Sequence, residues 1–347
     1  MEEQYRLVYF LGAGAARPCG YLTTPELYRS LVGERPNLSL LNRFGGLLNE
    51  ISKNSPWDLE TLFTMTGSNA ERALNAIFAQ LKPTAPEERL VAALMMQETQ
   101  LREAARDLQK AFEEARPAIL EFLIEKFWLV EPDLRPYREL RLGDSCQRLG
   151  FENVCVFTTN YDTSLEDSLK GITPFTTGVE EDEFTPTALS ARQNEKLRIV
   201  KLHGSLDLHV TRDNRVVRIP YPARAGQWRG GQQIARTFLV PPDAGKVHYD
   251  PDQESLIRLL QDEVGRANAL AIIGSSLRDN RLSEVLTSAS VDCEILVACG
   301  SRSADLARSR FTRHGRITIV ETHFPCKAIN DWLLGRIHYR GKPPPSE

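Results

Sequence analysis

The chain has 347 residues, enough for one large domain or two modest ones with a substantial buried core. Its 43 Lys and Arg residues nearly balance its 46 Asp and Glu residues, so no net field marks a nucleic-acid or membrane binder, and we expect neither partner. No apolar run approaches the roughly 20 residues of a membrane helix, and the amino terminus lacks the basic and then apolar order of a secretory signal, which predicts a cytoplasmic protein.

The six cysteines include no Cys-x-x-Cys pair. Structural zinc sites usually draw on such closely spaced pairs, so we expect no zinc ribbon and no bound metal. A disulfide framework is not expected in a cytoplasmic protein either. Most of these residues are therefore interpreted as buried, reduced thiols, at Cys19, Cys146, Cys155, Cys293, Cys299 and Cys326.

Six apolar runs predict β-strands, at about residues 5–11, 153–159, 197–202, 268–274, 293–299 and 316–321. Short helical patterns separate the last three, at Arg281 to Ser288 and at Ala304 to Phe311. Strand and helix alternating at this spacing predict an α/β fold with a doubly wound parallel sheet of about six strands.

The interval 36–150 breaks this alternation, because a crossover between two parallel strands needs only a dozen or more residues. We therefore expect a large inserted helical layer. Ser55-Pro56 is typical of a helix start, and leucines recur every seven residues in a predicted helix over 86–115. Core packing and a coiled-coil seam both fit this recurrence. An apolar helix over Ile119 to Trp128 is expected to be buried or to lie at a subunit contact.

Residues 206–250 form a second predicted insertion, irregular and rich in Gly, Pro and Arg, with a possible hairpin at Asp213-Asn214. Two interpretations stay open for its arginines, which are an anion or partner surface and a solvated loop. The arginines are Arg212, Arg215, Arg218, Arg224, Arg229 and Arg236.

Small residues follow the first strand, in the order Gly12-Ala13-Gly14-Ala15. Such a turn lets a pyrophosphate approach the backbone closely, and the amino terminus of a following helix would favour its charge by about 0.3–1 kcal/mol per group. A simple tight turn is the alternative, since Arg17 stands where the dinucleotide fingerprint has its third glycine. Gly274-Ser275-Ser276, after the fourth strand, has the same two interpretations.

Polar residues follow the second and third strands, at Thr159-Asn160-Tyr161-Asp162 and at His203-Gly204-Ser205. The carboxyl ends of parallel strands meet at one edge of a sheet, where open α/β sheets bind nucleotides. Each candidate also has a structural interpretation. Asp162 is placed to cap a helix over Thr163 to Leu169, Asn160 suits a left-handed turn, and His203 suits a strand end with its hydrogen bonds satisfied.

The blocks together resemble the sirtuin superfamily, and more closely its bacterial sirtuin-like branch found in phage-defence systems. The resemblance covers about residues 5–300 and is carried by Gly12-Ala13-Gly14-Ala15, Thr159-Asn160-Tyr161-Asp162, Lys201-Leu202-His203-Gly204-Ser205 and Gly274-Ser275-Ser276-Leu277-Arg278-Asp279. The zinc ribbon of protein-deacylating sirtuins is missing, and Gly20 to Pro25 replaces their Pro-Asp-Phe-Arg stretch, with Arg29 as a candidate for that arginine.

The resemblance implies a Rossmann-like site for NAD as the substrate. Gly12, Ala13, Gly14 and Ala15 would lie at the pyrophosphate, Asn160 and Asp162 around the nicotinamide and its ribose with Thr159 beside them, and Gly274, Ser275 and Ser276 on the adenosine side. His203 would be the catalytic base. The implied domains are a Rossmann-like NAD-binding domain of residues 1–35 and 151–330, the helical subdomain of 36–150, and a C-terminal helix and disordered tail over 331–347.

The implied activity is hydrolysis of NAD to nicotinamide and ADP-ribose, in bacterial defence against phage by NAD depletion. Two other hypotheses stay open, namely an NAD-dependent protein ADP-ribosyltransferase or deacylase, and a non-catalytic NAD-binding regulatory or scaffold subunit. Because uncontrolled NAD loss would kill the host, we expect control by a separate activating or ATPase partner protein or by assembly. The apolar helical layer predicts a homo-oligomer.

Overall fold

The computed structural model describes residues 5–22, 24–35, 118–128, 131–190, 195–219, 227–229, 231–239 and 251–340. The chain divides into two compact units, the first composed of Met1–Tyr21, Phe127–Val240 and Val247–Glu347, and the second of Leu22–Lys126 and Pro241–Lys246. The predicted helix start at Ser55, the predicted helix over 86–115 and the tail after residue 340 lie outside the described residues.

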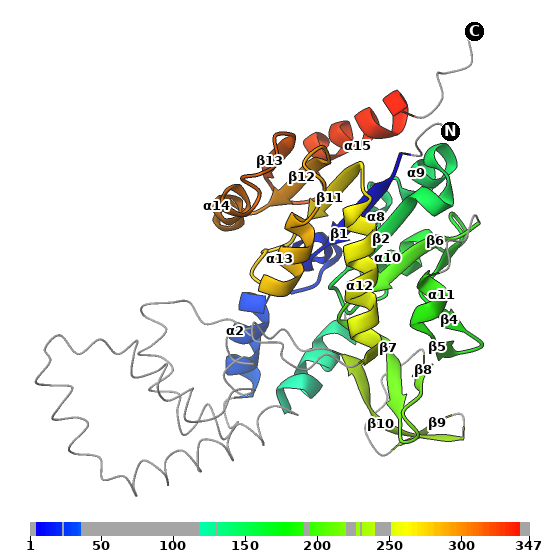
Figure 1. The fold of residues 1–347 in the computed structure, drawn as a ribbon. Coiled ribbons are helices and arrows are strands. Elements are labelled where there is room, and N and C mark those ends of the chain that lie inside the picture. The colour runs from blue at the N-terminus through cyan, green and yellow to red at the C-terminus, as the bar shows by residue number, and fades with distance from the viewer. Residues whose placement is uncertain are drawn as a thin grey trace, which may run out of the picture. The chain divides into compact units, whose positions relative to one another are not determined.

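The first unit is built on a seven-stranded sheet whose strands are all parallel (Figure 1). Its order, β13-β12-β11-β1-β2-β6-β3, contains the Rossmann succession of three strands on each side of a central crossing, with β3 added at one edge. The strands are β1 Leu7–Leu11, β2 Val154–Thr158, β3 Phe175–Thr176, β6 Leu197–Lys201, β11 Ala269–Ile273, β12 Glu294–Cys299 and β13 Ile317–Glu321.

The α/β class and the parallel sheet are confirmed, and all six predicted strands are present within two residues of their expected bounds. Every residue of β1, β2, β6 and β11 is buried, because helices cover both faces and each strand is a short apolar run rather than an alternating one. The seventh strand, β3, was not predicted, because two residues make no detectable apolar run.

Two hydrophobic cores lie on the opposite faces of this sheet. Alternate strand residues such as Val8, Phe10 and Val200 pack with α12 to α14, and Tyr9, Val156 and Ile199 pack with α9, α10 and α15. The helices are α8 Arg135–Arg138, α9 Leu142–Leu149, α10 Ser164–Leu169, α11 Pro186–Ser190, α12 Pro251–Gly265, α13 Asn280–Thr287, α14 Ser301–Arg310 and α15 Lys327–Arg340.

A second sheet of six strands is formed by two short strands that precede β6 and four that follow it, so the interpretation of the segment after β6 as irregular was wrong. Its order is β4-β5-β8-β7-β10-β9, and its pairs are antiparallel. The hairpin at Asp213-Asn214 is present, with Asn214 at φ 62°. Its strands are β4 Val179–Glu180, β5 Glu183–Phe184, β7 Gly204–Thr211, β8 Val216–Arg218, β9 Trp228–Arg229 and β10 Gln232–Leu239.

Arginines in this sheet have acidic neighbours. Arg215 contacts Asp213 at 2.7 Å and Glu183 at 3.7 Å, and Arg218 contacts Asp207 at 3.0 Å. These contacts favour a structural role for the two arginines over an anion-binding surface. The sequence does not show these ion pairs, because Glu183 lies far from Arg215 along the chain and the pairing of β7 with β8 brings Asp207 to Arg218.

In the described part of the second unit, α2 spans Thr24–Glu34. A helix over residues 118–128, whose last two residues belong to the first unit, begins where the apolar helix was predicted. Within this unit Lys126 contacts Glu34 at 2.6 Å, and Arg35 contacts Glu125 at 3.0 Å. Across the described ranges of both units, no helix has the length and apolar character needed to cross a bilayer.

Candidate functional site

Two glycine-containing loops meet where the strand order changes direction, between β1 and β11. The Gly14 amide donates to the Gly274 carbonyl at 2.8 Å, and the Gly12 amide donates to the Ile273 carbonyl at 2.9 Å. A Cβ atom at Gly12 would lie 2.6 Å from the Gly274 oxygen, and Gly274 itself has φ +69°. The glycines are therefore required by the close contact of the two backbones, whether or not a pyrophosphate also binds there.

The helix that follows Gly12 is only one turn long. Helix α1 spans only Ala13–Ala16 and runs into a 3-10 turn, η1, over Arg17–Cys19. Its macrodipole is correspondingly limited, so an anion at this loop would depend on individual amide groups. The Ala15 side chain is buried in the core and its amide donates to the Gly12 carbonyl at 2.9 Å, whereas Ala13 is exposed.

The loop after β2 is tied to β1 by a short chain of hydrogen bonds. The Thr158 hydroxyl donates to the Leu11 carbonyl at 3.1 Å and accepts from the Asn160 amide at 3.0 Å. The Thr159 amide also donates to the Leu11 carbonyl, at 3.1 Å. The residues expected around the nicotinamide thus follow directly from the strand end, next to the glycine loop of β1.

The Asn160 side chain is buried and its orientation is set by a tyrosine of α8. Its Nδ2 donates to the Tyr137 hydroxyl oxygen at 3.2 Å. Burial raises the pKa of Tyr137 well above its ordinary value, so this phenol stays protonated. Asn160 is not among the described residues with positive φ, so the left-handed turn proposed for it is wrong.

Asp162 divides its two oxygens between different roles. Oδ1 accepts from the amide of Ser164, the first residue of α10, at 3.0 Å, but the N-cap of this helix is Thr163, so Asp162 lies one residue before the position that the capping interpretation gave it. Oδ2 is buried and has no hydrogen-bond partner among the described residues. An unpaired buried acceptor costs about 1–3 kcal/mol, so this oxygen is available to a ligand that brings its own donor.

His203 lies just beyond the end of β6 and is 8% exposed at its side chain. Its ring centroid is 6.4 Å from that of Tyr161, in the loop after β2. Its Nε2 lies 3.9 Å from Asp279 Oδ2, in the loop after β11, and Asp279 Oδ1 accepts from the Leu282 amide at 3.0 Å to cap α13. The structure therefore brings the candidate base next to the loops of both neighbouring blocks.

The two serines that follow Gly274 accept hydrogen bonds within local turns. Ser275 Oγ accepts from the Leu277 amide at 3.2 Å, and Ser276 Oγ accepts from the Arg278 amide at 3.4 Å. Leu277 has φ 55° and its side chain is buried, which fixes the course of this loop. Ser276 is exposed, and Ser275 is half-buried beside Gly274.

Cys19 and Tyr21, which follow the glycine loop of β1, are buried next to the loop after β2. The pKa of Cys19 is raised to about 12, by burial first and by the Asp162 carboxylate second, so this thiol is not a nucleophile. The Tyr21 hydroxyl lies 2.8 Å from Ser164 Oγ, at the start of α10. Among the described residues, no group of three or more His, Cys, Asp or Glu side chains could hold a metal ion.

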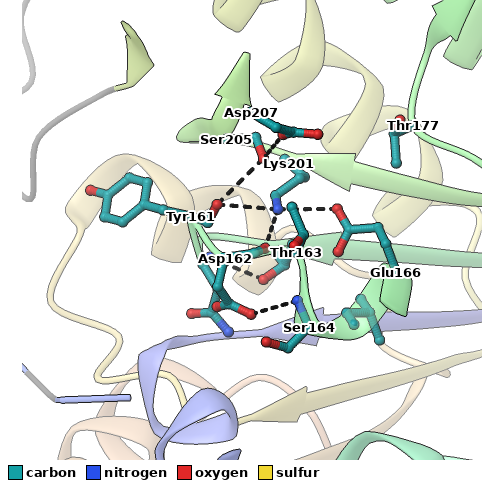
Figure 2. Close-up of polar contacts among 12 residues, drawn as sticks. Tyr161, Asp162, Thr163, Ser164, Glu166, Thr177, Lys201, Ser205 and Asp207 are labelled. Atoms are coloured by element: carbon teal, nitrogen blue, oxygen red, sulfur yellow. Dashed lines mark hydrogen bonds and ion pairs between the residues drawn. The ribbon is translucent and has the colours of Figure 1, made fainter. Parts of the chain in front are cut away.

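Several residues at the site carried no functional signal in the sequence. Tyr137 lies far from Asn160 along the chain, and no motif surrounds it. Lys201 contacts the Tyr161 and Asp162 carbonyls and the Glu166 carboxylate (Figure 2). Lys201 and Asp279 lie within the motifs that resemble sirtuins. The motifs do not predict the contacts of Lys201 with Glu166 or of Asp279 with His203.

Residues 154–292 match the family model described as a SIR2-like domain, which supports the sirtuin superfamily for this segment. The matched range runs from β2 through β11 and α13, and so includes Asn160, Asp162 and His203. No curated protein matches the chain. One solved structure, Sir2 with an inhibitor, 2'-O-acetyl-ADP-ribose and a deacetylated p53 peptide, is 12% identical, covers 94% of this chain and 90% of its own, and has a TM-score of 0.40.

Proposed function

Starting from the SIR2-like match of residues 154–292, we propose that this protein is an NAD hydrolase that releases nicotinamide and leaves ADP-ribose. One observation carries the proposal. Asn160 and Asp162 follow the end of β2, and His203 follows the end of β6, and these two strands are neighbours in a parallel sheet. The glycine loop of β1 lies on the other side of β2.

The described residues fit NAD at two points. The unpartnered, buried Oδ2 of Asp162 suits the carboxamide group of nicotinamide, whose NH₂ supplies the missing donor. The loop of Gly12 and Gly14 follows β1 at the same carboxyl edge of the sheet, where open α/β sheets bind nucleotides, and we place the pyrophosphate there. We place the adenosine side at Gly274 and Ser275 with Ser276 nearby, and Ala13, Ala15 and Thr159 along the same edge.

Cleavage of the nicotinamide glycosidic bond requires few catalytic side chains. The nicotinamide ring of NAD carries positive charge and leaves as a neutral molecule, so no general acid is needed. Asp162 orients the carboxamide through a charge-assisted hydrogen bond. Asn160, held by Tyr137, holds a water molecule or the ribose hydroxyls. His203 accepts a proton from that water or from a ribose hydroxyl, and a positioned base of this kind contributes about 10²–10⁴ in rate.

Asp279 favours His203 as the base. When the imidazole accepts a proton it becomes a cation, and the Asp279 carboxylate lies 3.9 Å from Nε2. The opposite charge stabilises the protonated form at that moment of the reaction. The carboxylate is held in place by its capping bond to the Leu282 amide.

We further propose that the protein is a cytoplasmic member of the bacterial, phage-defence type of sirtuin-like proteins and acts by depleting NAD. This step depends on the motif resemblance. A homo-oligomer, and a separate activating or ATPase partner that restrains the enzyme, belong to the same proposal, because free NAD hydrolysis would harm the cell that makes the protein.

The test is to incubate the purified protein with NAD and to follow nicotinamide and ADP-ribose by chromatography. We expect release without any added protein substrate. Release that requires an acetylated peptide would indicate a deacylase, and ADP-ribose attached to protein would indicate a transferase. Intact NAD bound at the site in every condition tried, including with lysate from phage-infected cells, would contradict hydrolysis and favour a regulatory subunit.

Three variants make the test specific to the site. His203→Ala and Asn160→Ala are each expected to reduce nicotinamide release by about 10²–10⁴. His323→Ala is the matched control, because His323 is an exposed histidine outside the site. Equal losses in His203→Ala and His323→Ala would show that the histidine after β6 has no special part.

A further inference from the structure

Lys201, the last residue of β6, is a buried cation close to the proposed site. Its side chain is 5% exposed, and it forms an ion pair at 3.1 Å with Glu166 of α10, whose side chain is 8% exposed. Neither residue has a part in the chemistry of NAD cleavage described above. The pair joins the end of β6 to α10, and Figure 2 shows the Lys201 ammonium group among the oxygens of Tyr161, Asp162 and Glu166.

The ammonium group of Lys201 has three donors, and three acceptors surround it. One is Glu166 Oε1, and the other two are the main-chain carbonyls of Tyr161, at 3.4 Å, and of Asp162. Tyr161 follows Asn160 in the chain, and Asp162 carries the unpartnered oxygen. Lys201 therefore contacts the backbone between the two side chains that we expect around the nicotinamide.

The same stretch of loop is held a second time by the start of β7. The Leu206 amide donates to the Tyr161 carbonyl at 3.0 Å, and Ser205 Oγ lies 3.3 Å from it. Ser205 also donates to Asp207, which Arg218 contacts at 3.0 Å. The loop after β2 is thus attached to the segment that runs through His203, from Lys201 on one side of the histidine and from Ser205 and Leu206 on the other.

Stability alone does not account for this ion pair. A buried ion pair is often no more stabilising than apolar side chains of similar volume, because taking both charges out of water offsets their attraction. Apolar residues at positions 166 and 201 would fill the space between α10 and β6. They could not donate to the carbonyls of Tyr161 and Asp162.

We propose that Lys201 is a positioning residue, which Glu166 holds in its buried position and which fixes the 159–163 loop for NAD. The expected effect on catalysis rests on the proposed function. The effect of Lys201 on the 159–163 loop does not, and it is measured without substrate.

The experiment compares two double variants of the full chain. Lys201→Met with Glu166→Leu removes the positioning pair, and Arg198→Met with Glu263→Leu removes the other buried pair of β6, which lies 3.0 Å apart and has 1% and 7% exposure. Removing both charges of a pair avoids leaving one charge buried alone, so both variants are expected to fold. Each is measured by hydrogen exchange and by the kinetics of nicotinamide release.

In the Lys201→Met/Glu166→Leu variant we expect faster exchange in peptides that cover 159–164, with the exchange of β1 and β11 unchanged. We expect kcat/KM for nicotinamide release to fall by about 10- to 10²-fold, since small displacements of reacting groups have effects of that size. The Arg198→Met/Glu263→Leu variant is expected to leave both readouts within about twofold of wild type.

Equal exchange of the 159–164 peptides in the wild type and in the Lys201→Met/Glu166→Leu variant would overturn the proposal. So would faster exchange spread evenly over all strands, which is the sign of a general loss of stability. If the wild type released no nicotinamide, the proposed function would fail, and the exchange result would still decide whether Lys201 fixes the loop.

Discussion

Strand β6 carries two buried ion pairs on opposite faces of the parallel sheet. Arg198 pairs with Glu263 of α12 at 3.0 Å, and Lys201 pairs with Glu166 of α10 at 3.1 Å. Beyond its carboxylate, Arg198 donates to the Leu189 carbonyl, at the end of α11, at 3.3 Å. Lys201 instead donates to carbonyls of the loop that carries Asn160 and Asp162.

The difference lies in the backbone that each cation holds. The Arg198 pair joins β6 to two helices, and no candidate site residue touches it among the described contacts. The Lys201 pair lies at the carboxyl end of the strand, where parallel sheets bind ligands. The two buried ion pairs of β6 are therefore expected to have different roles. The Arg198 pair stabilises the fold, and the Lys201 pair shapes the site.

The largest expected effect comes from removing one charge of either pair. Lys201→Met and Arg198→Met should each lower the free energy of unfolding by about 3–5 kcal/mol, because Glu166 or Glu263 is left buried without its partner. Urea denaturation followed by circular dichroism measures this loss. A loss under about 1 kcal/mol in either variant would mean that water reaches the remaining carboxylate.

A smaller effect should appear in the pH dependence of stability, through Glu166. Burial, opposed by Lys201 and reinforced by Asp207, raises the pKa of Glu166 above its ordinary 4.5, and Tyr137 is the other titratable group coupled to it. The folded state then holds the proton more tightly than the unfolded state. The resulting stabilisation is complete below pH 4.5 and is lost as pH rises through the raised pKa.

Free energies of unfolding of the wild type and of Glu166→Gln, measured from about pH 4 to about pH 8, isolate this contribution. The wild type should lose stability relative to Glu166→Gln as the pH rises, by about 1.4 kcal/mol for each unit of pKa shift. The opposite slope would show that attraction to Lys201 outweighs burial and that the pKa is lowered.

The smallest effect concerns the more exposed contact between His203 and Asp279, whose side chains are 8% and 20% exposed. Asp279→Asn removes the charge 3.9 Å from the imidazole but keeps a good capping residue for α13, so stability should change by only a few tenths of a kcal/mol. Nicotinamide release should fall about fivefold, which corresponds to roughly 1 kcal/mol for a partly solvated pair. An unchanged rate would remove Asp279 from the proposed site.

The sequence predicted the parallel sheet well because its strands are continuous apolar runs, which buried parallel strands require. It failed on the antiparallel sheet, four of whose strands follow β6. There β7 is buried throughout but mixes polar residues such as Asp207 and His209 with apolar ones, and β9 spans only two residues. These strands form because they pair with one another, and their own sequences do not show a strand pattern.

The candidate site was predictable where residue type and strand ends coincide, as for Asn160, Asp162 and His203. Tyr137 was not, because its contact with Asn160 depends on how α8 packs against the loop after β2. The two oxygens of Asp162 have different surroundings, since one accepts from the Ser164 amide and the other has no partner among the described residues. The sequence could not predict this difference, because it depends on the orientation of the side chain. Placement of the NAD-binding residues is still a prediction.

A crystal structure of the His203→Ala variant with NAD tests the central claim most directly. The account predicts the amide nitrogen of the nicotinamide at about 2.7–3.2 Å from Asp162 Oδ2, with the pyrophosphate against the loop of Gly12 and Gly14. Nicotinamide bound elsewhere, or Asp162 Oδ2 facing away from the ring and paired with the protein, would contradict it.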